Sequence, residues 1–343
     1  MSGQRISWEP FDHPGNTFVK MAVQPVIGAL VFALAIANTC AVRAAWPDDQ
    51  PVRIIVPQAA GGTNDTVARL VGVNLGRVLS QVVIVENRAG ASGAIGIQAV
   101  VQARADGYTL GLASDSAALL NVMQPQLVWQ FKRDLRGIGM IGEQPISISV
   151  SARSPYKSFE EVVAAAKARP GTIPYATSGA GTSQNVVGEW LAKLAGIQII
   201  HIPYKGGGEA TKDVLSGQAP VAVLGLAPML AQVKTGGVRI VAVTTARRSP
   251  SLPNVPTLTE LGYPQIALAQ WAGLVAPVST PESAVRRMSD AMLKILAGEE
   301  MRQRLSAGGI DPKPLAYQEF DKFLKENVET WERVVPSLNL KLE

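Results

Sequence analysis

One stretch of the chain, Tyr175–Glu189, limits most strongly what the sequence can fold into; it reads YATSGAGTSQNVVGE. A short apolar run ends in glycines and hydroxyl-bearing residues, and a helical pattern of apolar residues then opens toward Val186. Backbone N–H groups at a helix start carry partial positive charge and can hold an anion. The small residues leave room for that anion, which we predict to be a carboxylate. A Gly-rich turn with a Ser or Thr N-cap and no ligand is the alternative.

A second stretch of the same kind strengthens the anion-binding prediction. Residues 56–69 read VPQAAGGTNDTVAR, which again gives the end of a strand, a Gly-Gly turn, a polar cap and a helix. Two such turns that face each other would form a cleft.

Strands and helices alternate along the chain, which predicts an α/β layer fold. The expected strands of the first block are 52–56, 81–85 and 108–112, with a helix at 65–79. A strand at 146–150 and a helix at 157–168 come next. They precede a second block, which begins with a strand at Tyr175 and its helix. The block continues with strands at 201–204, 221–224 and 238–244 and a helix at 209–215. A strand at 270–276 and helices that begin near Pro281 and Gln318 complete the chain.

Length and composition indicate a globular protein. The 343 residues suffice for two domains, and the chain is 47% hydrophobic and 17% charged. The net charge of +5 is mildly basic, which suits an anionic ligand. No run of Lys and Arg is interleaved with aromatic residues, so we do not expect binding to nucleic acid.

The N-terminal 44 residues are predicted to be a secretory signal. Val26–Ala37 is an uncharged apolar core, and cleavage is expected after Ala44, although Met21 is a possible alternative start. The core is short for a membrane span, and an uncleaved anchor is the alternative. Cys40 is the only cysteine, so the mature protein would have no disulfide and no thiol chemistry.

Residues suited to catalysis or metal binding are scarce in the mature chain. His201 is its only histidine, and it lies between two isoleucines in a strand pattern. We find no set of His, Cys and carboxylate residues at metal-binding spacing and no nucleophile elbow around Ser178 or Ser183. We therefore expect no catalytic residues, no metal and no cofactor.

Seven motifs, in order along the chain, resemble those of a known family. They are VPQAAGGTNDTVAR (56–69), VENRAGASGAIG (85–96), DGYTL (106–110), YATSGAGTS (175–183), HIPYKGGGEA (201–210), AVTTARRSPSLPNVPT (242–257) and WAGLVAP (271–277). In these motifs the chain resembles the solute-binding proteins of tripartite tricarboxylate transporters, the Bug or TctC family.

The resemblance implies a two-lobed periplasmic binding protein of the type II-like, Venus-flytrap kind, in which each lobe is a mixed sheet flanked by helices. It places lobe 1 at 45–150 plus 269–343 and lobe 2 at 151–268. It implies a monomer that captures a small organic carboxylate between the lobes and delivers it to the membrane permease of a tripartite transporter. A periplasmic sensor that presents the carboxylate to a signalling receptor is the alternative function, and an enzyme is a third.

The resemblance also implies which residues bind the ligand. In lobe 1 they are Ala60, Gly61, Gly62, Thr63, Asp65, Ser114 and Ser116, and in lobe 2 they are Ser178, Gly181, Thr182, Ser183 and Tyr204. Asp65 has an alternative role as a first-turn acid favoured by the helix dipole. The chain departs from the family pattern at Asn185, where His is frequent, and at Gly225, where many members have Asp. The missing acid at Gly225 favours a ligand without an amino group.

Overall fold

The computed structural model describes residues 46–47, 50–61, 63–338 and 340. The predicted signal segment and Gly62 lie outside the described residues. The described chain from Trp46 onward forms one compact unit. None of its helices is long and apolar enough to cross a membrane.

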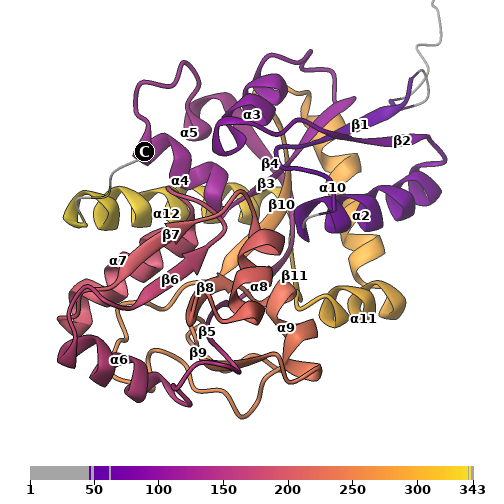
Figure 1. The fold of residues 1–343 in the computed structure, drawn as a ribbon. Helices are drawn as coiled ribbons and strands as arrows, with labels where there is room; N and C mark the ends of the chain where they lie inside the picture. The colour runs from indigo at the N-terminus through magenta and orange to yellow at the C-terminus, as the bar shows by residue number, and fades with distance from the viewer. Residues whose placement is uncertain (1–45, 48–49, 62, 339, 341–343) are drawn as a thin grey trace, which may run out of the picture. The chain divides into compact units, whose positions relative to one another are not determined.

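The first of two mixed sheets has six strands in the order β11-β4-β10-β3-β1-β2 (Figure 1). Its strands are β1 (Val52–Val56), β2 (Val83–Asn87), β3 (Thr109–Ser114), β4 (Leu135–Gln144), β10 (Gln270–Pro277) and β11 (Asp311–Leu315). β1 pairs in parallel with β2 and β3, whereas β10 runs antiparallel to both β3 and β4.

Helices cover both faces of the first sheet. α2 (Thr63–Leu79), α10 (Glu282–Leu296) and α11 (Glu299–Ala307) pack on one face. The opposite face is covered by α3 (Ala94–Val101), α4 (Asp115–Met123), α5 (Phe131–Asp134) and α12 (Tyr317–Val334). Short 3-10 turns lie at η1 (Ala91–Gly93) and η2 (Val335–Ser337). In β1, Ile54 and Ile55 point to opposite apolar clusters, which explains why VRIIV is an almost continuous apolar run.

The second sheet has five strands in the order β7-β6-β8-β5-β9. They are β5 (Ile146–Ser151), β6 (Pro174–Thr177), β7 (Ile200–Pro203), β8 (Val221–Gly225) and β9 (Val238–Val243). α6 (Phe159–Ala168) and α7 (Ser183–Ala195) pack on one face, and α8 (Gly207–Ser216) and α9 (Leu226–Lys234) pack on the other. β6 pairs in parallel with β7 and β8, and β5 is antiparallel to β8 and β9.

A glycine sets how closely α7 approaches its sheet. A Cβ atom on Gly188 would lie 2.4 Å from the ring of Tyr175 in β6, which is closer than packed atoms can come. Because Gly188 has no side chain, α7 lies directly on the Tyr175 ring, and this contact fixes the start of α7 relative to β6.

The predicted α/β fold with two helix-flanked mixed sheets is confirmed. Most predicted elements are present with ends shifted by one or two residues; the strand expected at 81–85, for example, is β2 at Val83–Asn87. The strands β4 and β11 and the helices α5, α9 and α11 were not predicted.

Candidate functional site

Residues at strand ends of the two sheets contact one another: Gln270 at the start of β10 donates to Ser183 after β6, and Gln144 at the end of β4 accepts from Ala227 after β8. β1 and β3 end at Val56 and Ser114, and β6 and β8 end at Thr177 and Gly225. The chain passes from one sheet to the other over Pro145 alone, since β4 ends at Gln144 and β5 begins at Ile146. Ligands of open α/β sheets bind beyond the carboxyl ends of the strands. The predicted ligand-binding residues follow the carboxyl ends of strands in both sheets, where such ligands bind.

In the loop after β1, Asp65 closes the turn that precedes α2. Its carboxylate accepts hydrogen bonds from the Gly61 N–H at 2.9 Å and from Asn87 Nδ2 at 2.9 Å, and it pairs with Arg69 at 2.9 Å. Burial raises the pKa of Asp65, but the hydrogen bonds from Arg69, Gly61 and Asn87 outweigh burial and lower it below its usual value. Asp65 is therefore a carboxylate whose oxygens are bonded to protein groups, and it holds the loop in shape.

The loop after β6 repeats this construction with a neutral side chain. The Gly181 N–H donates to Asn185 Oδ1 at 3.1 Å, and Asn185 is the third residue of α7 as Asp65 is the third residue of α2. Both glycines have left-handed backbones, with φ of +82° at Gly61 and +69° at Gly181. Asn185 Nδ2 in turn donates to the Tyr175 hydroxyl at 3.3 Å. We call these two turns the Gly–Asx loops: 57–65 after β1 and 178–185 after β6.

Hydroxyl groups of the second Gly–Asx loop also bond within the loop. The Thr182 hydroxyl donates to the Gly179 carbonyl at 2.8 Å and accepts from the Asn185 N–H at 3.3 Å. The Ser178 hydroxyl and N–H both donate to the Gln184 amide oxygen. These bonds orient the loop around the start of α7, where the first N–H groups have no acceptor in the helix itself.

Ser183, the first residue of α7, lies where helices of the two sheets touch. It is 0% exposed, and its hydroxyl accepts a hydrogen bond from Gln270 Nε2 at 3.1 Å. Asp115, the first residue of α4, is 1% exposed and hydrogen-bonds with both Ser183 and Gln270. Burial raises the pKa of Asp115 to about 6, because these hydrogen bonds only partly offset the loss of water.

A second polar contact joins the sheets beside this cluster. A Cβ atom on Gly225 would lie 2.5 Å from Gln270 Oε1 and 3.2 Å from Gln144 Nε2. Gln144 Oε1 accepts from the Ala227 N–H at 3.1 Å. The two glutamine amides thus occupy the space that a side chain at position 225 would need.

The other predicted residues are placed as follows. Ala60 and Gly61 are exposed, Thr63 and Ser116 are half-buried, and Ser114 is buried. Tyr204 follows β7, and its hydroxyl donates to Asp213 at 2.7 Å while its N–H donates to the Thr177 carbonyl at 3.1 Å. The structure therefore brings Ser114, Ser116 and Ser183 to one junction and Tyr204 beside the strand end at Thr177. The Gly-rich turn at 90–96 lies against the first Gly–Asx loop, because a Cβ atom on Gly96 would meet Pro57 at 2.6 Å.

Three residues of this junction were not among those predicted to bind the ligand: Asp115, Gln144 and Gln270. Asp115 carried the one available signal, since it stands between the predicted residues Ser114 and Ser116. The glutamines gave none, because each contacts residues far away in the sequence.

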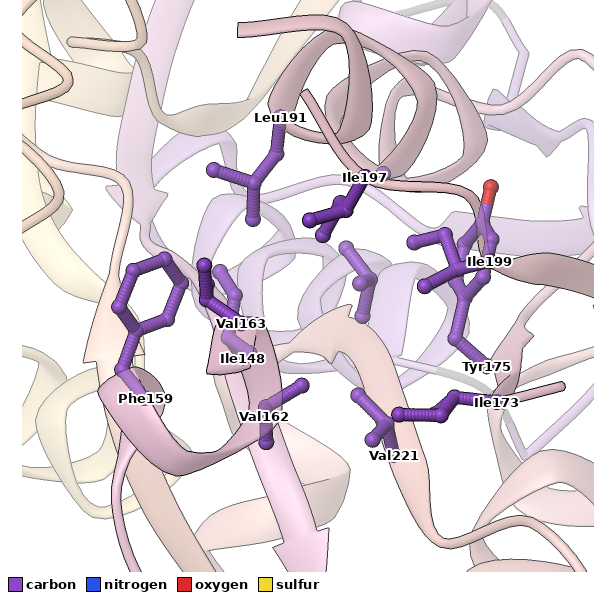
Figure 2. A pocket seen from close by; sticks show the side chains of 12 residues that line it. Ile148, Phe159, Val162, Val163, Ile173, Tyr175, Leu191, Ile197, Ile199 and Val221 are labelled. Carbon is purple, nitrogen blue, oxygen red and sulfur yellow. The ribbon is translucent and has the colours of Figure 1, made fainter. Parts of the chain in front are cut away.

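Two cavities lie away from the strand ends that carry the loops. The first, about 20 Å³, is enclosed by apolar side chains between β5, β6, α6 and α7, which include Ile148, Phe159 and Leu191 (Figure 2). It is too small and too apolar for a carboxylate. The second, about 240 Å³, lies at the amino ends of β1 and β3, where Arg53 and Thr109 line it.

His201 and the acidic residues bear on whether the site could perform catalysis or hold a metal. The His201 ring bonds to the Thr177 hydroxyl at 2.7 Å and packs on Tyr175, and burial lowers the pKa of His201 to about 4. Within the described residues, no three His, Cys, Asp or Glu side chains are grouped so that they could hold a metal ion.

Residues 67–340 match the family model described as TctC, the tripartite tricarboxylate transporter family receptor. The chain belongs to the TctC family. Its relatives include the protein BugT of Bordetella pertussis, which is 31% identical over 321 residues, covering 93% of this chain and 98% of BugT. The predicted resemblance to the Bug and TctC proteins is therefore confirmed, and with it the assignment to the solute-binding proteins.

Solved structures of similar proteins share the fold of this TctC-family chain. One is an R. palustris protein solved with adipate, with a TM-score of 0.81 and 26% identity, covering 86% of this chain and 99% of that one. Another is MatC from Rhodopseudomonas palustris with bound malate, with a TM-score of 0.77 and 26% identity, covering 84% and 99% of the two chains. These neighbours confirm the two-lobe periplasmic-binding-protein fold.

Proposed function

We propose that this TctC-family protein binds a small organic carboxylate where the strand ends of its two sheets meet. The observation that carries the proposal is the pair of Gly–Asx loops, in which Asp65 and Asn185 each accept the N–H of a left-handed glycine at a helix start. The helix N-termini supply backbone N–H groups and partial positive charge. The adipate and malate in the neighbouring structures support a dicarboxylate of similar size.

The state of Asp65 and His201 supports binding of the ligand without a chemical reaction. Asp65 is bonded to protein groups, and His201 is held neutral by burial at the pH of most biological fluids. We infer that the ligand leaves unchanged and that the protein acts in the periplasm as a monomer. The two lobes would close on the ligand by rotation about the strands that connect them. The closed form would then deliver it to the permease of a tripartite transporter.

A thermal-shift and calorimetry screen of the protein purified from the periplasm tests the proposal. The panel contains mono-, di- and tricarboxylates, including adipate and malate, with amino acids and neutral amides for comparison. A carboxylate at a hundred times its dissociation constant is expected to add about 2.7 kcal/mol to the stability. No stabilisation by any carboxylate would overturn the proposal, as would conversion of the ligand during long incubation, followed by NMR.

Two glycine variants separate a binding effect from a backbone effect. Gly181 has φ of +69° in the second Gly–Asx loop, and Gly196 has φ of +62° at the C-terminal end of the same helix. Alanine at either position has the same left-handed strain, about 1 kcal/mol. We expect both variants to lose similar stability, while only Gly181→Ala weakens carboxylate binding, by 10-fold or more. Equal affinities in the two variants would show that the ligand binds elsewhere.

Delivery to a permease has its own test. The protein loaded with the carboxylate hit, cross-linked in cells and purified, is expected to carry an integral membrane permease with it. Recovery of a signalling receptor in place of a permease would contradict transport and leave carboxylate binding intact.

A further inference from the structure

Asp115 is a buried acid with an unpaired oxygen. Its Oδ2 atom is shielded from solvent and has no hydrogen-bond partner, and the same is true of Oε1 in the neighbouring Gln270. An ionised carboxylate can only accept hydrogen bonds, whereas a protonated one can also donate. Two buried acceptors therefore lie in one cluster without donors, and one of them is able to gain a proton.

Among the described residues, the groups that act on Asp115 are hydrogen-bond partners, and none of them carries a charge. The elements β3, β10, α3 and η1, which contact α4, contain no charged residue. On the other elements packed against α4, the charged residues contact other groups. In α7 and α5 they are Glu189 with Tyr175, Lys193 with Ser337, Lys132 with Glu329 and Glu332, and Arg133 with Asp134. In α12 they are Glu319 with Ala316, Asp321 with Gly137, Lys322 with Glu326, Arg333 with Thr330, and Lys325, whose charge acts on Asp321.

The cluster spans the junction of the two sheets. Asp115 begins α4 of the first sheet, Ser183 begins α7 of the second, and Gln270 begins the strand that returns from the second sheet to the first. A rotation that separates the two sheets at this junction lengthens the distance between Asp115 and Ser183. A second acid at the junction is Asp311 of β11, which contacts Ser249 at 3.4 Å and is only half-buried.

We propose that Asp115 binds a proton when α4 and α7 are in contact, and that loss of this proton favours separation of the two sheets. A buried carboxylate with one oxygen that has no hydrogen-bond partner is costly, so it either takes up a proton or becomes hydrated. Separation of α7 from α4 admits water to Asp115. The proton thereby acts as a ligand of the closed arrangement.

The direction and the pH range of the change in the closed population depend on the pKa of Asp115 in the two arrangements. With water admitted, the pKa returns toward its usual 3.8, whereas in the closed arrangement burial raises the pKa to about 6. Below the lower value Asp115 is protonated in both arrangements, so pH has no effect. Between the two values the closed arrangement loses population as pH rises, and above the higher value the loss is complete. The total change in the closed-to-open ratio is on the order of 100-fold at most.

The first test needs no ligand. In a Cys40→Ser background, nitroxide labels at Arg104→Cys and Lys167→Cys report the distance between exposed positions of the two sheets. We expect the population with the longer distance to grow from pH 4.5 to pH 6.5 and then to level off. Carboxyl-detected NMR is expected to show one Asp titrating near pH 6, and this signal is lost in Asp115→Asn.

Asp115→Asn mimics the protonated side chain, and Asp321→Asn is the matched control. Asp321 is also an acid whose pKa is raised by burial, but it contacts Gly137 within the first sheet. We expect Asp115→Asn to keep the shorter distance at every pH and Asp321→Asn to behave like the parent. The proposal is overturned if the distance distribution of the parent does not change with pH, or if it changes equally in Asp115→Asn.

A further consequence concerns affinity, and it rests on the proposed function. With adipate or malate as the probe, the dissociation constant of the parent is expected to rise at least 10-fold between pH 4.5 and pH 6.5, and that of Asp115→Asn to stay within 3-fold. If neither probe binds, the proposed function fails while the label and NMR results still decide the proton site. A parallel rise in both proteins would contradict the role of Asp115.

Discussion

The two Gly–Asx loops have the same backbone plan and different chemistry. In the first, a charged Asp65 accepts the glycine N–H and is paired with Arg69, whose side chain is 51% exposed. In the second, a neutral Asn185, which is as buried as Asp65, accepts the equivalent N–H next to the Tyr175 hydroxyl that donates to Glu189 at 2.6 Å. The turn needs only a side-chain oxygen at the third helical position, and the surroundings decide whether that oxygen can carry a charge.

The largest expected effect comes from placing a charge in the second loop. Asn185→Asp would put a carboxylate in a buried position linked to Glu189 through the Tyr175 hydroxyl, and its hydrogen-bond partners in the described chain, Gly181, Thr182 and Tyr175, carry no positive charge. We expect a loss of about 3–5 kcal/mol of stability at pH 7, measured by urea unfolding. The loss should shrink as pH falls and the new acid takes up a proton. A loss below 1 kcal/mol at pH 7 would show that the second loop tolerates charge as well as the first.

The second-largest effect is expected from disturbing the packing of α7 on β6, which supports the second loop. Gly188→Ala would place a methyl group 2.4 Å from the Tyr175 ring and push α7 away from β6. Overpacking of this kind is expected to cost about 1–3 kcal/mol. Gly72→Ala in α2 is the counterpart beneath the first loop, where the nearest atoms are side-chain carbons of Val83 and Val85 at 3.3 Å. Melting temperatures should therefore fall more for Gly188→Ala, and the reverse order would contradict the packing argument.

Removing the charge from the first loop has a smaller effect. Asp65→Asn keeps one acceptor for Gly61 but loses the charge-assisted bonds to Arg69 and Asn87, so we expect a loss of about 1–2 kcal/mol at pH 7. The pKa of Asp65 is lowered in the folded protein. Its contribution is therefore present above the usual Asp value and disappears as pH falls through the lowered one. The parent and Asp65→Asn should have converging stabilities in strong acid, and a constant difference would exclude the charge as its cause.

The smallest loss of stability is expected from removing the charge of Arg69, the exposed partner of Asp65. Arg69→Met removes the guanidinium and keeps most of the apolar stem, which leaves Asp65 with its bonds to Gly61 and Asn87. Because exposed ion pairs contribute little, unfolding in urea should show a loss of about 0.5 kcal/mol. A loss as large as that of Asp65→Asn would mean that Arg69 is the main support of the first loop.

The strands that sequence analysis missed depend on distant contacts. β4 is interrupted by glycines, which disfavour a strand when judged locally. In the structure, a Cβ atom on Gly137 would lie 2.8 Å from the Phe320 ring, and one on Gly142 would lie 2.7 Å from the Asp311 carbonyl. These glycines let α12 and β11 approach β4 from far along the chain. β11 itself contains two prolines, which an edge strand tolerates and a central one does not.

In the site too, features formed by neighbouring residues in the sequence were predicted, and contacts between distant residues were not. Both Gly–Asx loops were predicted because strand, turn, cap and helix follow one another within about fifteen residues of sequence. The junction of Asp115, Ser183 and Gln270 was not, since the bond between Gln270 and Ser183 joins residues 87 positions apart. The lobe boundaries and the roles of individual ligand-binding residues stay predictions.

The passage of the chain between the sheets over Pro145 alone has an evolutionary consequence. In β5, Ile146, Ile148 and Val150 contact the apolar cluster under α6 and α7, while Ser147 and Ser149 point to the opposite face, where their hydroxyls bond to each other at 3.1 Å. An insertion of one residue beside Pro145 that shifted the pairing of β5 with β8 and β9 by one position would exchange these two faces, placing serines among hydrocarbon side chains. We therefore expect chain length to be more tightly constrained at this crossing than in the surface loops.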